Sequence, residues 1–238
     1  MNNNSLSTYD FKEGEVLLFE KPLSWTSFDL VRKIRSLIKR KLNIKNIKVG
    51  HAGTLDPLAT GLMILCTGNK TKEIEKFQAT EKEYIADIFI GATTPSFDLE
   101  TEINNKYPTK HIDLELINQI VNSFIGKQEQ MPPQYSAKRI DGQRAYKKAH
   151  QGIEVEMKPS EIEIYNIEIL NYSFPDLKIK INCSKGTYIR SLANDIGKKL
   201  NSGAYLSGLI RTKIGDFKIE NAIQISDFKN SLFPEDTE

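Results

Sequence analysis

The stretch KVGHAGTLDPLATG, residues 48–61, governs how the rest of the chain is interpreted. It places one carboxylate, Asp56, between glycine-rich backbone and a proline. Glycine permits tight turns and close backbone approach, and Pro57 restricts the residue before it to an extended conformation. Two interpretations are open: Asp56 caps a helix that begins at Pro57, or it is a reactive carboxylate that the loop presents. The loop alone does not choose between them.

A cation-rich amphipathic helix is predicted on the N-terminal side of this loop. Thr26 and Asp29 have the spacing of a capping box, and apolar residues then recur at helical spacing as far as Ile38. The basic stripe, defined as residues 32–48, holds eight Lys and Arg and no Asp or Glu. Such a stripe fits a polyanionic partner, and a solvated helix face would also explain it.

Predicted strands and helices alternate on the C-terminal side. Apolar alternation predicts strands at residues 84–90 and 177–183, and a phase shift within residues 161–170 predicts a bulge. Asp113 is expected to cap a helix. Because no repeat, linker or low-complexity tract interrupts the chain, one domain is expected.

Arg190 is unusual for its place in the chain. Residues 184–190 join a predicted strand to a predicted helix, so that Arg190 lies in the first helical turn. A cation there is unfavourable against the helix dipole. This favours a specific partner such as a carboxylate, although a solvent-facing arginine is the commoner case.

Composition excludes several classes of protein. The chain has 238 residues, of which 39% are hydrophobic and 27% charged, as is ordinary for soluble proteins. No apolar run approaches the roughly 20 residues of a membrane-spanning helix, and the N-terminus does not resemble a secretory signal, so a cytoplasmic location is expected. Cys66 and Cys183 are expected to be buried free thiols. The three histidines lack metal-ligand spacing, so no metal site is expected.

With these blocks assembled, the sequence resembles the B family of tRNA pseudouridine synthases, which isomerises the uridine at position 55 in the T-loop. The resemblance covers about residues 21–217, and GHAGTLDPLATG (50–61) is its strongest element. Further blocks follow in the family's order: KPLSWTS at Lys21, TGNKTK at Thr67, KEYIADIFIG at Lys82, MPPQYSAKRIDGQRAY at Met131, CSKGTYIRSLANDIG at Cys183 and LIRTKIGDF at Leu209. The resemblance favours the reactive interpretation of Asp56.

The resemblance implies an α+β fold, with a mixed, largely antiparallel central sheet flanked by helices and an RNA-binding cleft. It implies a single catalytic domain over residues 1–238. Ser24 stands where the family usually has glycine, which is a departure from the pattern. Because only about twenty residues follow Phe217, the separate C-terminal RNA-binding domain of many relatives is expected to be absent.

The resemblance also implies the roles of the site residues. Asp56 would act at C1′ of a flipped-out uridine, paired with Arg190, while the ring of Tyr84 stacks on the uracil. His51 would fill the vacated space, and the loop glycines would leave room for RNA. Tyr188 and Leu209 are expected to line the uracil pocket, whereas Lys21, Lys72 and the basic stripe are expected to contact the RNA backbone. The isomerisation involves no net redox change or hydrolysis, so neither cofactor nor metal is expected.

The expected partner is tRNA, at its T-loop and elbow. No membrane and no obligate protein partner is expected, and the protein is expected to be a monomer. The rival interpretation is a catalytically idle module that binds or folds tRNA. The presence of Asp56, Tyr84 and Arg190 together argues against lost catalysis.

Overall fold

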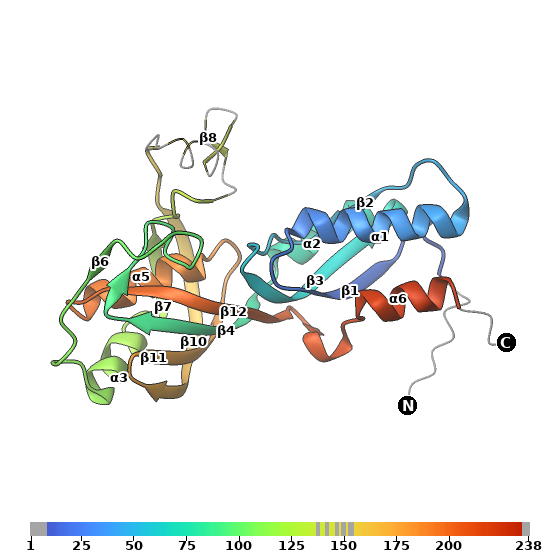
Figure 1. Cartoon of the computed structure of the whole chain (residues 1–238). Coiled ribbons are helices and arrows are strands. Elements are labelled where there is room, and N and C mark those ends of the chain that lie inside the picture. The colour runs from blue at the N-terminus through green and yellow to red at the C-terminus, as the bar shows by residue number, and fades with distance from the viewer. Residues whose placement is uncertain are drawn as a thin grey trace. The chain divides into compact units, whose positions relative to one another are not determined.

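The chain divides into two compact units in the computed structural model, which describes residues 9–136, 139, 140, 143–145, 148, 151 and 155–234. Unit 1 comprises the chain up to Lys82 together with the part from Ile210 onward, and unit 2 comprises Glu83–Leu209 (Figure 1). Two strands, β4 (Lys82–Ile90) and β12 (Ala204–Ile214), carry the chain from one unit into the other. The prediction of a single catalytic domain stays a prediction.

Unit 1 is built around the strand β3 (Ala59–Thr67), which pairs with strands on both sides. β1 (Val16–Lys21) and β2 (Val49–His51) both run antiparallel to it. In this unit β12 is the next neighbour of β3 in the sheet, and the short β13 (Phe217–Lys218) pairs with the end of β12. The helices are α1 (Ser27–Leu42), the 3-10 turn η1 (Gly68–Glu73), α2 (Ile74–Ala79), the 3-10 turn η2 (Ile219–Asn221) and α6 (Ile225–Leu232).

The apolar run Leu62–Cys66 lies in β3 with every side chain fully buried. A strand covered on both faces needs no alternation of apolar and polar residues, so periodicity alone cannot distinguish it from a buried helix. The interpretation in which Asp56 caps a helix from Pro57 is therefore wrong, because a strand follows the loop.

The predicted helix α1 is confirmed together with its N-terminal cap. The side chain of Thr26 accepts from the Asp29 backbone N–H, and the Asp29 carboxylate accepts from that of Thr26. The apolar face of α1 is buried, and the helix contacts β2 and α6 (Figure 1). The ring of Phe228 in α6 meets that of Phe19 edge-on at 5.2 Å. Most of the basic-stripe cations that lie on α1 are exposed, and the stripe continues beyond the end of the helix to Lys48.

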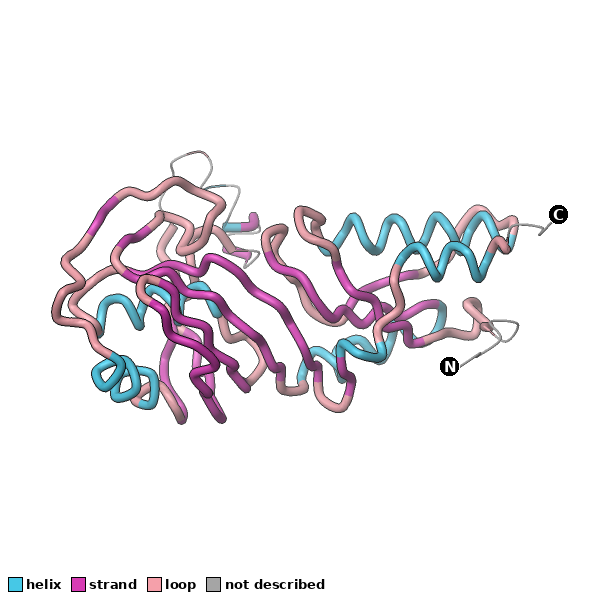
Figure 2. The backbone as a smooth tube through the Cα atoms, turned by 60° about the horizontal axis from the view of Figure 1, so that its bottom comes forward, coloured by secondary structure: helices cyan, strands magenta, loops and turns pink. Residues whose placement is uncertain are grey.

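Unit 2 holds a sheet with the strand order β12-β4-β11-β10-β7. Figure 2 shows these strands side by side in magenta. Besides β4 and β12, unit 2 contains β5 (Ala92–Thr93), β6 (Asn105–Lys106), α3 (Leu114–Asn122), β7 (Gly126–Gln130), β8 (Arg139–Ile140), β9 (Gln143–Arg144), β10 (Ser160–Ser173), β11 (Asp176–Cys183) and α5 (Ile189–Lys199).

The local predictions for unit 2 are confirmed. β4 and β11 alternate between buried and more exposed residues, and the register of β10 against β11 shifts between Ile164 and Asn166. Asp113 caps α3 by accepting from the backbone N–H of Leu116. The α+β class with a mixed, mainly antiparallel sheet is thus confirmed. Within the described residues, no helix combines the length and apolar character needed to cross a membrane.

Candidate active site

Asp56 lies in unit 1, in the loop between β2 and β3. We call residues 52–58 the Asp56 loop. Its backbone is held at five successive carbonyl oxygens. Gly53 O accepts from Arg211 Nη2 at 3.2 Å, Thr54 O from Arg211 Nη1 at 3.4 Å, Leu55 O from Ser27 Oγ at 3.0 Å, Asp56 O from Ala59 N at 3.1 Å and Pro57 O from Ser24 N at 2.9 Å. The place of Asp56 is therefore set by its backbone.

Lys21 lies under the loop with its side chain fully buried. Its ammonium donates to the carbonyl oxygens of Pro22 at 2.9 Å, Trp25 at 2.6 Å and Pro57 at 3.4 Å. Burial lowers the pKa of Lys21 from 10.5 to about 8, the charge of Asp56 opposes that change and the charge of Arg211 adds to it. The expected contact between Lys21 and the RNA backbone does not fit this placement, since an ammonium that binds three carbonyls has no open face.

The other predicted residues of unit 1 surround the same loop. His51 ends β2, directly before the loop, and lies opposite Leu65 of β3. Lys72 is exposed on η1, as a contact with RNA requires. Gly61 has a φ of +107°, and a Cβ on it would lie 2.4 Å from the carbonyl oxygen of Arg211. At Gly61, the space left by the missing side chain is therefore filled by the backbone of β12, and not left open for RNA.

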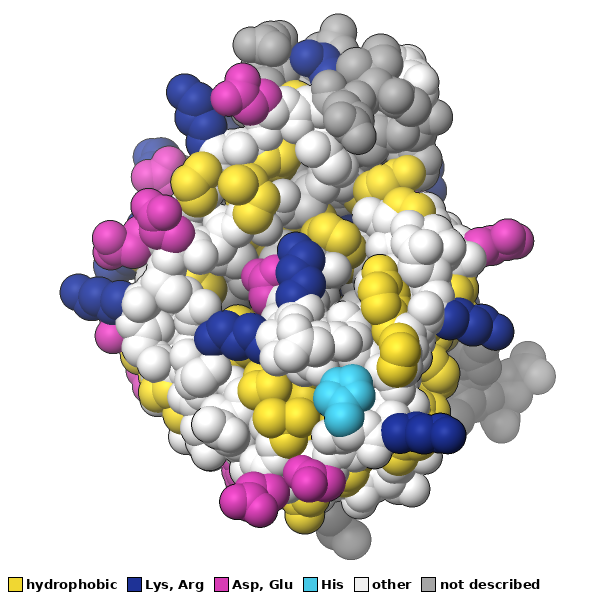
Figure 3. Space-filling view, turned by 90° about the vertical axis from the view of Figure 1, so that its left-hand side faces the viewer, with side chains coloured by type: hydrophobic (Ala, Val, Ile, Leu, Met, Phe, Trp, Pro, Cys, Tyr) yellow, Lys and Arg dark blue, Asp and Glu magenta, His cyan; other side chains and the backbone are white. Residues whose placement is uncertain are grey.

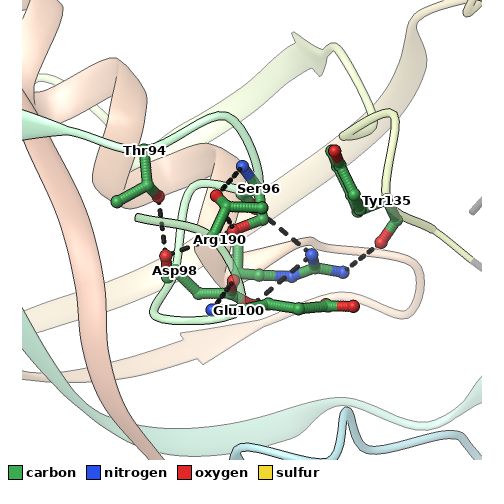
Figure 4. Close-up of polar contacts among 7 residues, drawn as sticks. Thr94, Ser96, Asp98, Glu100, Tyr135 and Arg190 are labelled. Carbon is green, nitrogen blue, oxygen red and sulfur yellow. Dashed lines mark hydrogen bonds and ion pairs between the residues drawn. The ribbon is translucent and has the colours of Figure 1, made fainter. Parts of the chain in front are cut away.

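Arg190 lies in unit 2, in the first turn of α5, and is 3% exposed. Its Nη1 lies 3.5 Å from Asp98 Oδ2 and donates to Ser96 O at 3.3 Å, while its Nη2 donates to Tyr135 O at 2.8 Å (Figure 4). We call these four residues the Arg190 pocket. The solvent-facing interpretation of Arg190 is wrong, and a carboxylate partner is present within the unit. The pairing of Arg190 with Asp56 joins residues of two units and stays a prediction.

Asp98 is a site residue that sequence reasoning missed. It is 4% exposed, and its own loop fixes it: Oδ1 accepts from Glu100 N at 3.0 Å and its carbonyl accepts from Thr94 Oγ1 at 2.6 Å (Figure 4). The preceding Phe97 has a φ of +64°, a region that bulky residues rarely adopt. The only signal in the sequence was an acid in a polar, turn-rich segment.

The remaining predicted residues also lie in unit 2. Tyr84 is 9% exposed on β4. The backbone N–H of Tyr188 donates to Gln130 Oε1 at 2.8 Å, and its carbonyl accepts from Gln130 Nε2 at 3.0 Å. Leu209 lies half-buried on β12. The structure thus brings Tyr188 and Arg190 together at the start of α5, and it places Lys21, His51, Asp56 and Lys72 in unit 1.

A hollow of about 330 Å³ lies beside α5 in unit 2. Its lining is formed by Phe97, Met131, Pro132, Pro133, Gln134, Met157, Ser191, Asn194, Asp195 and Lys198. Figure 3 shows one face of the molecule, on which separate hydrophobic side chains lie around a basic and an acidic side chain near the centre. Ser191 Oγ donates to Met131 O at 2.8 Å, so two successive residues of α5, Arg190 and Ser191, tie down the segment from Met131 to Tyr135. For residues 145–150 the sequence allows either contact with nucleic acid or an ordinary surface helix, and this segment lies largely outside the described residues.

The thiols and the possible metal ligands show no reactive arrangement in the part of the chain that the structure describes. Cys66 and Cys183 are buried and neither is part of a disulfide, as predicted. Burial, with the charge of Glu73 in addition, raises the pKa of Cys66 to about 11, which makes a reactive thiolate unfavourable. No group of three His, Cys, Asp or Glu that could hold a metal ion is found among these residues.

Comparisons with known proteins find relatives over nearly the whole chain. A family model described as TruB family pseudouridylate synthase (N terminal domain) matches residues 39–189. The chain is 57% identical over 229 residues to tRNA pseudouridine synthase B of Phocaeicola vulgatus, covering 96% of this chain and 97% of the relative. It is 54% identical to tRNA pseudouridine synthase B of Bacteroides fragilis, covering 96% of this chain and 98% of the relative.

Two solved structures with a similar fold are structures of larger assemblies. A chain of a Cbf5-Nop10-Gar1 complex matches with a TM-score of 0.69 and 28% identity, covering 92% of this chain and 54% of that chain. A chain of an H/ACA RNP bound to a substrate RNA containing 2'-deoxyuridine matches with a TM-score of 0.64 and 26% identity, covering 92% and 53%. This chain therefore spans about half the length of these two.

Proposed function

Because the chain belongs to the TruB family of pseudouridine synthases, whose members in the comparison act on tRNA, we propose that it converts the uridine at position 55 of the tRNA T-loop to pseudouridine, with Asp56 as the reacting carboxylate. The chain is an isomerase that forms pseudouridine in tRNA. The position of the uridine and the roles of single residues are the proposed part.

The observation that carries the proposal is the rigid presentation of Asp56. Five successive backbone carbonyls of the Asp56 loop are hydrogen-bonded, so the side chain leaves the loop from a fixed point. Catalysis by a carboxylate gains most when the reacting group needs no reorganisation. The charge of Asp56 acts on the buried ammonium of Lys21 and raises the pKa of that lysine against the effect of burial.

The reaction makes a specific demand on this carboxylate. The C1′–N1 bond breaks, the uracil rotates, a C1′–C5 bond forms, C5 loses its proton and N1 gains one. Positive charge develops at C1′, as in glycoside hydrolysis. A carboxylate beside C1′ serves either route to the product, as a nucleophile that forms an adduct or as a base that removes a sugar proton to give a glycal.

Residues of unit 2 supply the other functions in this proposal. The guanidinium of Arg190 pairs with Asp56 in addition to Asp98, and the ring of Tyr84 stacks on the uracil. Tyr188 and Leu209 line the uracil pocket. His51 of unit 1 fills the space that the flipped nucleotide leaves.

RNA binding is assigned to the exposed cations of unit 1. Lys72 and the outward face of α1, which carries much of the basic stripe, can neutralise backbone phosphates. We propose that these contacts, made by a monomer in the cytoplasm without an obligate protein partner, hold the T-loop and the elbow of tRNA. Binding of this kind weakens steeply as salt is raised.

The test uses a tRNA transcript tritiated at C5 of uracil, because formation of pseudouridine releases that tritium. The wild-type protein is expected to release it with multiple turnovers, and Asp56→Asn is expected to release none while binding the transcript normally. Turnover by Asp56→Asn at the wild-type rate would remove Asp56 from the mechanism. A wild-type protein that binds tRNA and releases no tritium at stoichiometric concentration would support the idle binding module instead.

A further inference from the structure

Arg211 is the other large cation buried beside the Asp56 loop. It lies on β12, in the part that belongs to unit 1, and is 1% exposed. Its Nε donates to Leu62 O of β3 at 2.8 Å, and its two terminal nitrogens donate to Gly53 O and Thr54 O. One guanidinium thus connects the strand after the loop with the loop's first half.

The fork of arginine suits this task better than any other side chain. The planar guanidinium presents donors in fixed directions, so it can hold three carbonyl oxygens at once. Ser27 holds the next residue in the same way, because its hydroxyl donates to Leu55 O at 3.0 Å and accepts from Leu55 N at 2.8 Å. Arg211 and Ser27 together fix the three residues that precede Asp56.

The backbone around Arg211 is adapted to this contact. A Cβ on Gly61 would lie 2.4 Å from Arg211 O and 2.7 Å from Arg211 N. A Cβ on Gly53 would meet Arg211 Nη1 at 3.5 Å, and both glycines have φ above +100°. Glycine at position 61 therefore allows β12 to approach β3 closely enough for the guanidinium to reach the loop.

Burial of the charge of Arg211 is unfavourable in free energy. Its named hydrogen-bond partners are all neutral carbonyl oxygens, and a buried cation without a nearby negative charge is strongly unfavourable. Asp56 and Arg211 both act electrostatically on the ammonium of Lys21. The three charges are thus near one another within unit 1.

We infer that Arg211 is a positioning residue for the reaction: it fixes the backbone that carries Asp56 and adds positive charge near that carboxylate. The inference rests on the proposed role of Asp56. Loss of Arg211 lets the loop shift, and a small misplacement of a reacting group can lower the rate by roughly 100-fold. Because Arg211 is buried under the loop, its loss has little effect on binding of the RNA.

The experiment compares Arg211→Met, Arg211→Lys and Ile64→Ala by tritium release under saturating single-turnover conditions, by tRNA affinity and by thermal unfolding. Ile64 is a fully buried residue of β3, and its backbone carbonyl, which accepts from Ala52 N at 2.9 Å, is retained in Ile64→Ala, so this variant is a control for lost stability. We expect Arg211→Met to lower the saturating rate roughly 10- to 100-fold with the tRNA Kd nearly unchanged. Arg211→Lys restores the charge without the fork, and its rate is expected to lie in between.

Two results would overturn the inference. One is a wild-type rate in Arg211→Met, or in Arg211→Lys if only that variant folds. The other is an equal loss of rate in Ile64→Ala at the same melting temperature, because the effect would then follow stability alone. Asp56→Asn is measured in the same series: turnover by that variant contradicts the proposed function, whereas inactivity of Asp56→Asn with a wild-type rate in Arg211→Met contradicts only the role of Arg211.

Discussion

Two buried arginines, one in each unit, are held in different ways. Arg190 of unit 2 has a carboxylate partner, Asp98, together with two carbonyl oxygens. Arg211 of unit 1 donates to three carbonyl oxygens. Asp98 compensates part of the charge of Arg190 locally, whereas the charge of Arg211 acts on the ammonium of Lys21.

The difference indicates that the two arginines have separate tasks. An ion pair orients a guanidinium that faces a substrate, and it keeps the cation buried at an acceptable cost in free energy. A guanidinium on carbonyls orients backbone instead. The Arg190 pocket is therefore sensitive to the loss of a charge, and the Asp56 loop is sensitive to the loss of hydrogen bonds.

Asp98→Ala breaks the ion pair and is expected to have the largest effect on stability. Removing one partner of a buried pair leaves an uncompensated charge and costs about 3 to 5 kcal/mol in the free energy of unfolding. Urea denaturation measures this loss of unfolding free energy. Asp87→Ala is the matched control, because Asp87 pairs with Lys178 at 3.1 Å on the surface, where a pair contributes about 1 kcal/mol or less. Equal costs for the two variants would mean that the Arg190–Asp98 pair is not a buried, coupled pair.

Lys21→Met removes a titrating cation that lies beside the Asp56 loop. Lys21 has a pKa of about 8 in the folded protein and 10.5 as an ordinary lysine. Between these values the unfolded chain binds more protons than the folded one, so stability rises with pH. The unfolding free energy of the wild type, relative to Lys21→Met, is expected to rise by about 2 to 3 kcal/mol between pH 7 and pH 10.

Urea denaturation of the wild type and of Lys21→Met across that pH range gives the difference between their unfolding free energies. The contributions of titrating groups that both proteins share cancel in this difference. A difference that stays constant with pH would show that the three carbonyl partners hold the ammonium in its charged form. In that case Lys21 would resemble Arg211, as a permanent cation under the loop.

Ser27→Ala tests the uncharged hydrogen bonds that hold the Asp56 loop. It removes both hydrogen bonds to Leu55 and leaves a buried N–H and a buried carbonyl without this partner, at a cost of about 1 to 3 kcal/mol. The matched control is Ser231→Ala, whose hydroxyl binds Phe228 O within its own helix and is expected to matter little. Thermal unfolding compares them. A Ser27→Ala protein as stable as the wild type would mean that the loop keeps its conformation without Leu55 being held.

Lys33→Gln is expected to have the smallest effect and separates the rigid loop from the exposed stripe on α1. Each phosphate contact contributes about 0.9 to the slope of log affinity against log salt for duplex nucleic acid. Replacing one exposed cation of the stripe is expected to reduce that slope by roughly this amount without changing the saturating rate. Lys127→Gln, an exposed cation of β7, is the control. A similar slope change in both variants would argue against a specific role for the stripe.

The sequence predicted the parts of the molecule that local patterns determine. The capping box of Thr26 and Asp29, the alternation in β4 and the bulge in β10 are each set by neighbouring residues, and all are confirmed. β3 was ambiguous, because burial on both faces removes the alternation by which a strand is recognised.

The missed residues act over long distances in the sequence. Arg211 binds Gly53 from 158 positions away, and in LIRTKIGDF it has the pattern of an ordinary charged residue in a strand. Asp98 meets Arg190 only because the loop that carries Asp98 folds against the start of α5. Lys21 was expected to contact RNA, and only its burial under the loop shows that its partners are carbonyls.

The central claim is that Asp56 makes pseudouridine at position 55 of tRNA. Its most direct test is to map pseudouridine in bulk tRNA from cells that lack the gene and carry either the wild-type protein or Asp56→Asn. We predict that pseudouridine at position 55 disappears in the deletion, returns with the wild type and stays absent with Asp56→Asn. Pseudouridine that persists at position 55 in the deletion, or returns with Asp56→Asn, would contradict the account.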